Sequence, residues 1–427
     1  MKTFLDWSAY QDAGMGDAYA DIPKHGGHFA KAVAVCINSR QCETAGKQVM
    51  CPSFQVSGNP NLSTGGRVRL LKAALSNDLT QEALCDPTLT EAMELCVSCK
   101  GCKRECEANV DMALIKVEYR AQQVAREGVR LRERLLARLS ERWIGISAQR
   151  QLPEPAPKPF TLPDASPPSP GVSADGRPEV VLLVDTFTHH FEPEIAEAAL
   201  AVLQAGGYAV QVARPATSDP EPTRPLCCGR TYLVQGMLDE ARAEVRRLVD
   251  VLLPHVQAGR AVVGLEASCV VNLREDGQAL GLGDAVATVG DKILLFEEFL
   301  ARESMAKRLS LPLRPLQETE TLVHGHCHQK AVGAMKAMRR VLKLIPGHDF
   351  SMIEAGCCGM AGSFGLEAEH AEMASAMAER DLMPALRDKP KAQIIANGFS
   401  CRQQMCLHGD TRSRHLAILL REALVGT

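Results

Sequence analysis

The feature that most constrains this chain is a run of four cysteines at C-x2-C-x2-C-x3-C spacing, from Cys96 through Cys99 and Cys102 to Cys106. Gaps of two residues let three thiolates converge on one cuboidal iron–sulfur cluster, whereas the longer last gap directs the fourth thiolate to a different cluster. The run therefore predicts electron transfer, and it predicts a second group of cysteine ligands elsewhere in the chain.

The second group of cysteines lies upstream of this run. Cys36, Cys42 and Cys51 follow one another at C-x5-C-x8-C-P spacing. Because the last thiolate of the run serves the other cluster, the ligands are expected to cross over between the two groups. Two ligand sets are predicted: Cys51 with Cys96, Cys99 and Cys102 for a 4Fe–4S cluster, and Cys106 with Cys36 and Cys42 for a second cluster.

The arrangement of Cys36, Cys42 and Cys106 resembles that in the iron–sulfur subunit of succinate dehydrogenase and fumarate reductase, where three such cysteines bind a 3Fe–4S cluster. By that resemblance it holds a 3Fe–4S cluster, or a 4Fe–4S cluster completed by Cys85, His25 or His28. The sequence departs from that pattern in the longer gap before Cys51 and in Glu107, which replaces a proline. Structural zinc is the alternative for the cysteine run, but zinc sites normally use two separated C-x2-4-C pairs.

Composition excludes several classes of function. The net charge of −3 and the pI near 6.5 argue against a nucleic-acid binder, which needs a basic face. No apolar run approaches the length of a membrane span, and the N-terminus lacks the apolar core of a signal peptide, so we expect a cytoplasmic protein. Sixteen cysteines in a reducing compartment are expected to be metal ligands or buried thiols rather than disulfides.

The remainder of the chain divides by composition. A helical pattern with apolar and arginine-rich faces runs from about Met112 to Trp143, and a proline-rich stretch follows. Beyond it, short apolar runs alternate with helical segments, which favours a parallel sheet flanked by helices. We predict a mixed fold, in which an α-helical ferredoxin-type domain is followed by a duplicated α/β domain. The predicted domains are an N-terminal segment at 1–30, the helical 4Fe–4S domain with its basic helix at 31–148, a linker at 149–178, a first α/β repeat at 179–315 and a second at 316–427.

Each predicted repeat carries a Cys-Cys-Gly motif and a later cysteine that follows an apolar strand. The first repeat keeps Cys227, Cys228 and Cys269, but Thr186 stands where the second repeat has Cys327, and we expect the ligand role to be lost there. The carboxyl edge of a parallel sheet is where α/β units build their sites. Four cysteines of the second repeat are therefore predicted to hold a further cluster: Cys327, Cys357, Cys358 and Cys401.

Three histidines occupy alternate positions around the first of these cysteines. His324, His326 and His328 would point to one side of an extended strand, which suits metal ligation or proton handling. The alternative, which we favour for any single one of them, is that the histidines cap a buried polar sheet edge.

Several motifs occur in an order that matches a known family. They resemble the iron–sulfur part of FAD-linked 2-hydroxyacid dehydrogenases of the D-lactate and D-2-hydroxyglutarate type. More distantly, the chain is similar to iron–sulfur subunits of glycolate oxidase, anaerobic glycerol-3-phosphate dehydrogenase and heterodisulfide reductase. The motifs are Cys51-Pro-Ser-Phe54, Asn109-Val-Asp-Met112, Val184-Asp-Thr-Phe187, Glu192-Pro-Glu194, His324-Gly-His-Cys-His-Gln-Lys330 and Cys357-Cys-Gly-Met-Ala-Gly-Ser-Phe-Gly365.

The resemblance implies an electron-transfer subunit with no FAD of its own and no 2-hydroxyacid site. An FAD-containing dehydrogenase subunit would oxidise the substrate, and this chain would pass single electrons through its clusters to a quinone or cytochrome. Activity on a substrate is not expected without that partner. Peripheral association with the inner face of the membrane is an alternative to a purely cytoplasmic location.

Two other functions stay open at this point. In a reductase similar to heterodisulfide reductase, the Cys-Cys-Gly site would itself act on a thiol, a disulfide or a quinone. The chain could also be a part split from a fused dehydrogenase, which a flavin-domain reading frame directly upstream would indicate.

Overall fold

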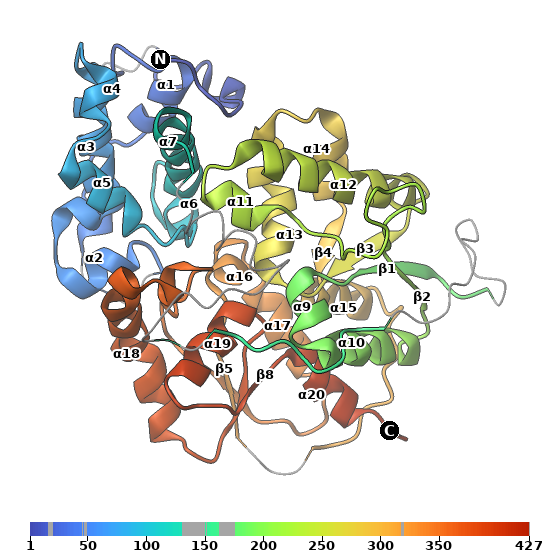
Figure 1. Cartoon of the computed structure of the whole chain (residues 1–427). Helices are drawn as coiled ribbons and strands as arrows, with labels where there is room; N and C mark the ends of the chain where they lie inside the picture. The colour runs from blue at the N-terminus through green and yellow to red at the C-terminus, as the bar shows by residue number, and fades with distance from the viewer. Residues whose placement is uncertain are drawn as a thin grey trace.

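The computed structural model describes residues 1–15, 20–44, 46, 49–129, 150, 152–161, 176–316 and 320–426. Within these residues the N-terminal part is helical, and two small parallel sheets with flanking helices follow it (Figure 1). The mixed α and β content agrees with the predicted fold class. None of the described helices is long and apolar enough to cross a membrane.

Short helices separated by cysteine-bearing loops make up the N-terminal part. Ser63, Asp86 and Asp111 begin three of them, because each side chain accepts a hydrogen bond from a backbone N–H of the first turn. The helices are η1 Ser8–Tyr10, α1 His28–Ala34, η2 Gln41–Glu43, α2 Pro52–Ser57, η3 Pro60–Leu62, α3 Thr64–Ser76, α4 Thr80–Ala83, α5 Pro87–Glu94, α6 Gly101–Glu105 and α7 Met112–Glu127.

The helix predicted from about Met112 to Trp143 begins at the predicted residue. It ends at Glu127, where Gly128 takes a φ of 75° that ends the helical path. The rest of that prediction falls on residues 130–149, which lie outside the described part of the chain.

Two four-stranded parallel sheets share one strand order. In the first sheet the order is β2-β1-β3-β4, and in the second it is β6-β5-β7-β8. Apolar β-branched residues favour such buried parallel strands, and Val180 to Leu183 of β1 are almost fully buried. The strands are β1 Glu179–Leu183, β2 Ala209–Val212, β3 Ala261–Gly264, β4 Ile293–Leu295, β5 Thr321–Val323, β6 Phe350–Met352, β7 Gln393–Ile395 and β8 Ser413–Arg414.

Helices cover both sheets and connect their strands. Those of the first sheet are α9 Thr186–His190, α10 Pro193–Ala205, α11 Arg230–Val234, α12 Leu238–Gln257, α13 Ala267–Arg274, η4 Asp276–Leu280, α14 Asp284–Gly290 and α15 Phe296–Met305. Those of the second sheet are α16 Cys327–Ala331, α17 Met335–Leu342, η5 Phe364–Leu366, η6 Ala368–His370, α18 Ala371–Asp388, α19 Phe399–Leu407 and α20 Leu416–Ala423.

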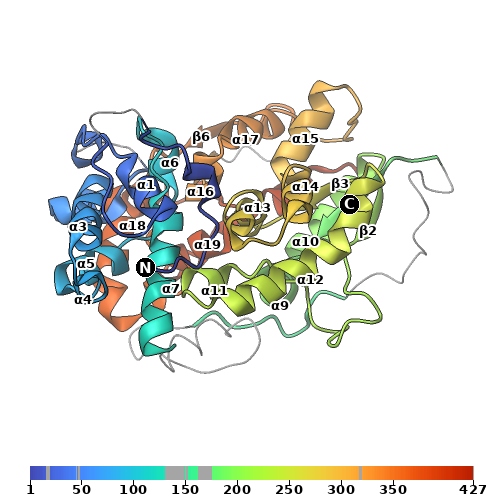
Figure 2. The same ribbon diagram turned by 90° about the horizontal axis from the view of Figure 1, so that it is seen from above.

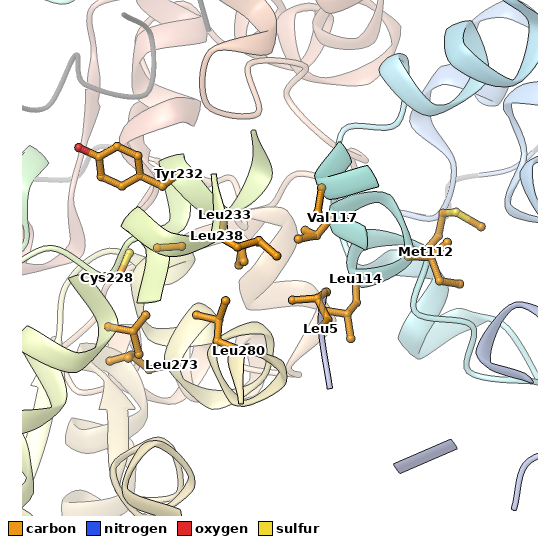
Figure 3. Packing of buried hydrophobic residues seen from close by; sticks show 14 of the residues in the cluster. Leu5, Met112, Leu114, Val117, Cys228, Tyr232, Leu233, Leu238, Leu273 and Leu280 are labelled. Carbon is orange, nitrogen blue, oxygen red and sulfur yellow. The ribbon is translucent and has the colours of Figure 1, made fainter. Parts of the chain in front are cut away.

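One apolar core joins the N-terminal helices to the first sheet. Leu114 and Val117 of α7 face Leu233 and Leu238, and Leu5 of the N-terminal segment lies beside them (Figure 3). Burial of each such leucine stabilises the fold by about 1.5–3 kcal/mol. The helical part is also in contact with the second sheet's helices, since α6 lies beside α16 (Figure 2).

Candidate iron–sulfur site

The four-cysteine run forms a loop that winds between α5 and α7. Cys102 lies in α6, and Cys106 follows the last residue of that helix. Ser98 and Lys100, on either side of Cys99, take φ values of 48° and 58°. Left-handed backbone at residues other than glycine is uncommon and costs free energy, and such strain concentrates at functional sites. The loop is therefore held in a conformation that the surrounding packing must stabilise.

The upstream cysteines lie at the N-terminus of α3. Cys51 Sγ accepts a hydrogen bond from Thr64 N at 3.0 Å, and Cys42 Sγ accepts one from Gly65 N at 3.2 Å. A helix N-terminus favours thiolates over thiols. The hydrogen bond from the Cys51 thiol lowers the pKa of Cys42 to about 6, against the opposing effect of burial.

The thiols that shift one another's pKa values show which of the predicted N-terminal ligands lie near each other. Burial raises the pKa of Cys36, and Cys106 and Cys42 are the thiols that add to this effect. Burial also raises the pKa of Cys102 to about 12, to which Asp111 and Cys96 contribute. Of the three thiols predicted for the second cluster, Cys42 and Cys106 both act on Cys36. Cys51 interacts with Cys42, and it also interacts with Cys102 of the run.

The cysteine side chains described by the structure are not arranged around a common point as the ligands of one metal ion would be. Among the residues that the structure describes, no three His, Cys, Asp or Glu side chains are placed as ligands of one metal ion. The chemistry of the N-terminal cysteines nevertheless fits an iron–sulfur group, because they are soft sulfur ligands that are half-buried or buried. The sulfur of Cys51 also accepts a hydrogen bond at the N-terminus of α3. The predicted ligand sets stay predictions.

The second sheet brings its four predicted ligands to its carboxyl edge. Cys327 is the first residue of α16 and Cys401 the third of α19, which follow β5 and β7. Both are buried, as are Cys357 and Cys358 on the loop before α18. Hydrogen bonds from Cys327 and Cys358 lower the pKa of Cys357 well below its usual range. The hydrogen bonds of Cys358 with Cys357 and Cys401 raise the pKa of Cys358. Cys406, which belongs to none of the predicted ligand sets, is exposed.

Glycine permits this Cys-Cys-Gly turn. Gly359 has a φ of 91°, and a Cβ built on it would lie 2.2 Å from the backbone oxygen of Ala374 in α18. Only a residue without a side chain can take this conformation in this space. The turn therefore seats Cys357 and Cys358 directly against α18.

The three histidines of the second sheet are buried, and one has a clear structural role. His326 is the N-cap of α16, and its ring nitrogen accepts a hydrogen bond from His328 N at 3.2 Å. Burial lowers the pKa of His326 to about 4, and it lowers the pKa values of His324 and His328 well below their usual range. All three rings are therefore neutral at pH 7.

A cavity of about 380 Å³ lies where the two sheets' carboxyl edges and the cysteine run meet. Arg230, Phe187 and Phe399 line it beside the thiols. The sequence does not predict this arrangement, because the motifs of each repeat are local and do not specify how the two repeats pack together. The cysteines that line the cavity come from both repeats and from the run: Cys96, Cys227, Cys228, Cys269, Cys327, Cys357 and Cys358.

A buried charge network ties the run to the first sheet. Lys100 is 1% exposed, and its Nζ lies 2.6 Å from Asp276 and 2.9 Å from Glu275. Burial opposes its charge, but these two carboxylates and Asp111 together raise the pKa of Lys100. Asp276 in turn pairs with Arg230 at 2.8 Å. No local sequence pattern marked these residues, since the partners lie far apart in the chain.

Comparisons with known proteins agree with the cysteine motifs. The chain is 23% identical over 372 residues to D-2-hydroxyglutarate dehydrogenase of Escherichia coli K12, a match that covers 78% of the chain and 34% of that protein. It is 24% identical over 253 residues to one of the subunits of anaerobic glycerol-3-phosphate dehydrogenase of the same organism, a match that covers 59% of the chain and 60% of that protein. The chain is a homologue of these dehydrogenase proteins.

The homology confirms the resemblance to these two kinds of dehydrogenase. A D-2-hydroxyglutarate dehydrogenase of Pseudomonas putida KT2440 is 27% identical over 250 residues. No family model matches the chain. The chain spans about a third of the Escherichia coli D-2-hydroxyglutarate dehydrogenase and less than two thirds of the glycerol-3-phosphate dehydrogenase protein.

Proposed function

We propose that this chain is an iron–sulfur electron-transfer subunit of a flavin-dependent 2-hydroxyacid dehydrogenase. It receives electrons from an FAD-containing partner and delivers them to a quinone or cytochrome. The observation that carries this proposal is that Cys99, Cys327 and Cys357 belong to one small buried cluster. The cysteine run and the Cys-Cys-Gly site are thereby adjacent, as an electron path between two redox groups requires.

The thiols have distinct assignments in this proposal. When bound, iron–sulfur clusters supply one-electron transfer at potentials that burial and hydrogen bonds tune. Thr64 N and Gly65 N donate hydrogen bonds to the Cys51 and Cys42 sulfur atoms and fix their positions. The assigned ligands are Cys51, Cys96, Cys99 and Cys102 for a 4Fe–4S cluster, Cys36, Cys42 and Cys106 for a second cluster of 3Fe–4S or 4Fe–4S type, and Cys327, Cys357, Cys358 and Cys401 for a third.

The partner assignment follows the homologues. One homologue is named as a subunit of a dehydrogenase, so association with a separate flavoprotein is proposed for this chain as well. We place the complex in the cytoplasm or on the inner face of the membrane. The same boundaries predicted from the sequence, with the helical cluster domain at 31–148 and the repeats at 179–315 and 316–427, are proposed as its domains.

Anaerobic purification tests the proposal. The chain should be brown, contain iron and acid-labile sulfide, and bleach with dithionite while an EPR signal develops. Cys99→Ser should remove roughly one cluster's iron, whereas Cys406→Ser, which removes an exposed thiol outside the predicted ligand sets, should keep it. A colourless protein loaded with zinc would refute the proposal.

The cavity shared by both repeats favours a second candidate, a thiol, disulfide or quinone reductase that uses the Cys-Cys-Gly site. Cys358→Ser separates the two functions. Loss of turnover with the other clusters and flavoprotein binding intact indicates a reductase. Loss of only one cluster signal indicates a relay.

A further inference from the structure

Three thiols of the first repeat have no place in the proposed ligand sets. Thr186 begins α9 after the N-cap Asp185, as Cys327 begins α16 after the N-cap His326. Cys269 is the third residue of α13, as Cys401 is of α19. The first repeat therefore repeats the geometry of the second but lacks one thiol of the four.

Two of the remaining thiols are in direct contact. Cys228 Sγ donates a hydrogen bond to Cys269 Sγ at 3.1 Å, and both residues are buried. The backbone around them is fixed, because Asn272 Nδ2 donates to the carbonyl oxygen of Cys228 at 2.7 Å. Gly229 takes a φ of 74° with no room for a Cβ beside Ala241.

Burial and nearby negative charge keep this pair protonated. The Cys228 hydrogen bond lowers the pKa of Cys269, but burial and the carboxylates of Asp185 and Glu266 raise it to about 11. The two thiols are therefore held in the reduced form, the dithiol from which a disulfide is made.

We propose that Cys228 and Cys269 form a redox-active dithiol that cycles with a disulfide. Closing the bond shortens the separation of the two sulfur atoms from 3.1 Å to about 2.05 Å, a small movement for side chains already in contact. Oxidation forms one S–S bond and releases two electrons and two protons. A quinone that enters the cavity takes up both electrons and both protons and leaves as the quinol.

The position of Cys228 and Cys269 suits them to exchange electrons with the proposed clusters. Cys228 and Cys269 line the same cavity as Cys327 and Cys357, so the oxidised pair faces the proposed cluster site across one small space. Two successive one-electron transfers from the clusters, with two protons, reduce the disulfide again. This inference rests on the proposed function for its electron source, and it gives the chain a two-electron group between one-electron clusters and a two-electron acceptor.

The test uses the full chain, prepared anaerobically in a Cys406→Ser background that removes the exposed thiol. Samples are poised with dithionite or with a soluble naphthoquinone, quenched in acid, treated with N-ethylmaleimide under denaturing conditions, and digested for mass spectrometry. Iron, sulfide and dithionite bleaching are measured on the same samples. Cys227→Ala is the matched control, because it removes a neighbouring cavity thiol and leaves the pair.

The expected result is a peptide cross-link that contains Cys228 and Cys269 in the quinone-treated protein. It should be lighter by two hydrogens than the reduced pair, present in Cys227→Ala, and absent from Cys228→Ala and Cys269→Ala. Full alkylation of both thiols after oxidation overturns the inference, and so does a loss of iron in Cys269→Ala, which would make the residue a ligand.

The two proposals fail separately. Clusters that bleach with dithionite while no disulfide forms leave the electron-transfer function standing and overturn the dithiol. A disulfide that forms in a chain without iron or sulfide retains the dithiol and removes the proposed function.

Discussion

Replacing Gly359 with alanine should separate the strain of the Cys-Cys-Gly turn from its packing. The residue has a φ of 91°, and an alanine Cβ would lie 2.2 Å from the Ala374 oxygen. A left-handed alanine costs about 1–2 kcal/mol relative to glycine. The contact is about 1 Å too short, and relieving it must move the turn away from α18, which adds about 1–3 kcal/mol as overpacking does. We expect a total loss of about 2–5 kcal/mol.

A matched glycine isolates the steric part. Gly409 has a φ of 83° and nothing within 4 Å of a built Cβ, so Gly409→Ala should cost only the conformational strain of about 1–2 kcal/mol. Urea unfolding followed by circular dichroism, with iron counted on the folded protein, measures both variants. Gly359→Ala should also lose iron from the second repeat. Equal unfolding midpoints for the two variants would show that the turn does not press against α18, and the reasoning would be refuted.

Three further variants test other parts of the structure. Lys100→Met should destabilise the chain by about 3–5 kcal/mol in urea unfolding, because the buried carboxylate of Asp276 loses one of its two cationic partners. An unchanged midpoint would contradict the network. Glu118→Ala should cost about 2–4 kcal/mol and speed proteolysis of the first ten residues, since its buried carboxylate accepts hydrogen bonds from Leu5 N and Trp7 Nε1; uniform proteolysis would argue against this role. Burial raises the pKa of Asp185 from 3.8 to about 6, so the folded state holds its proton longer than the unfolded state does. The free energy of unfolding should therefore fall by up to about 3 kcal/mol as the pH rises from 3.8 to about 6. Asp185→Asn should remove this pH dependence, which unfolding measured over the same pH range would show.

Local spacing provides most of what the sequence predicts about the site, and the ligand sets themselves stay predictions. The crossed cysteine groups and the Cys-Cys-Gly motifs are short patterns whose chemistry does not depend on distant residues. The α/β alternation likewise followed from apolar runs such as Val180 to Leu183. The shared cavity and the Lys100 network depend instead on which helices pack together, and side-chain periodicity does not encode the partners of Glu275 or Arg230. The sequence does not indicate that α7 ends at Glu127, because apolar residues at helical spacing continue beyond Gly128.

The missing thiol of the first repeat provides the sharpest test of how the repeats diverged. Thr186→Cys restores a thiol at the start of α9, on the wall of the cavity that Cys227, Cys228 and Cys269 already line. Four thiols placed as in the second repeat should favour thiolate ligation over a neutral dithiol, because a bound cluster stabilises the deprotonated sulfur. We expect more iron per chain than in the wild type and no cross-link after oxidation. Thr231→Cys adds a thiol to the same cavity away from this strand end, and it should leave both readouts unchanged. If Thr186→Cys and Thr231→Cys bind equal iron, then the fourth thiol is not what distinguishes the two repeats.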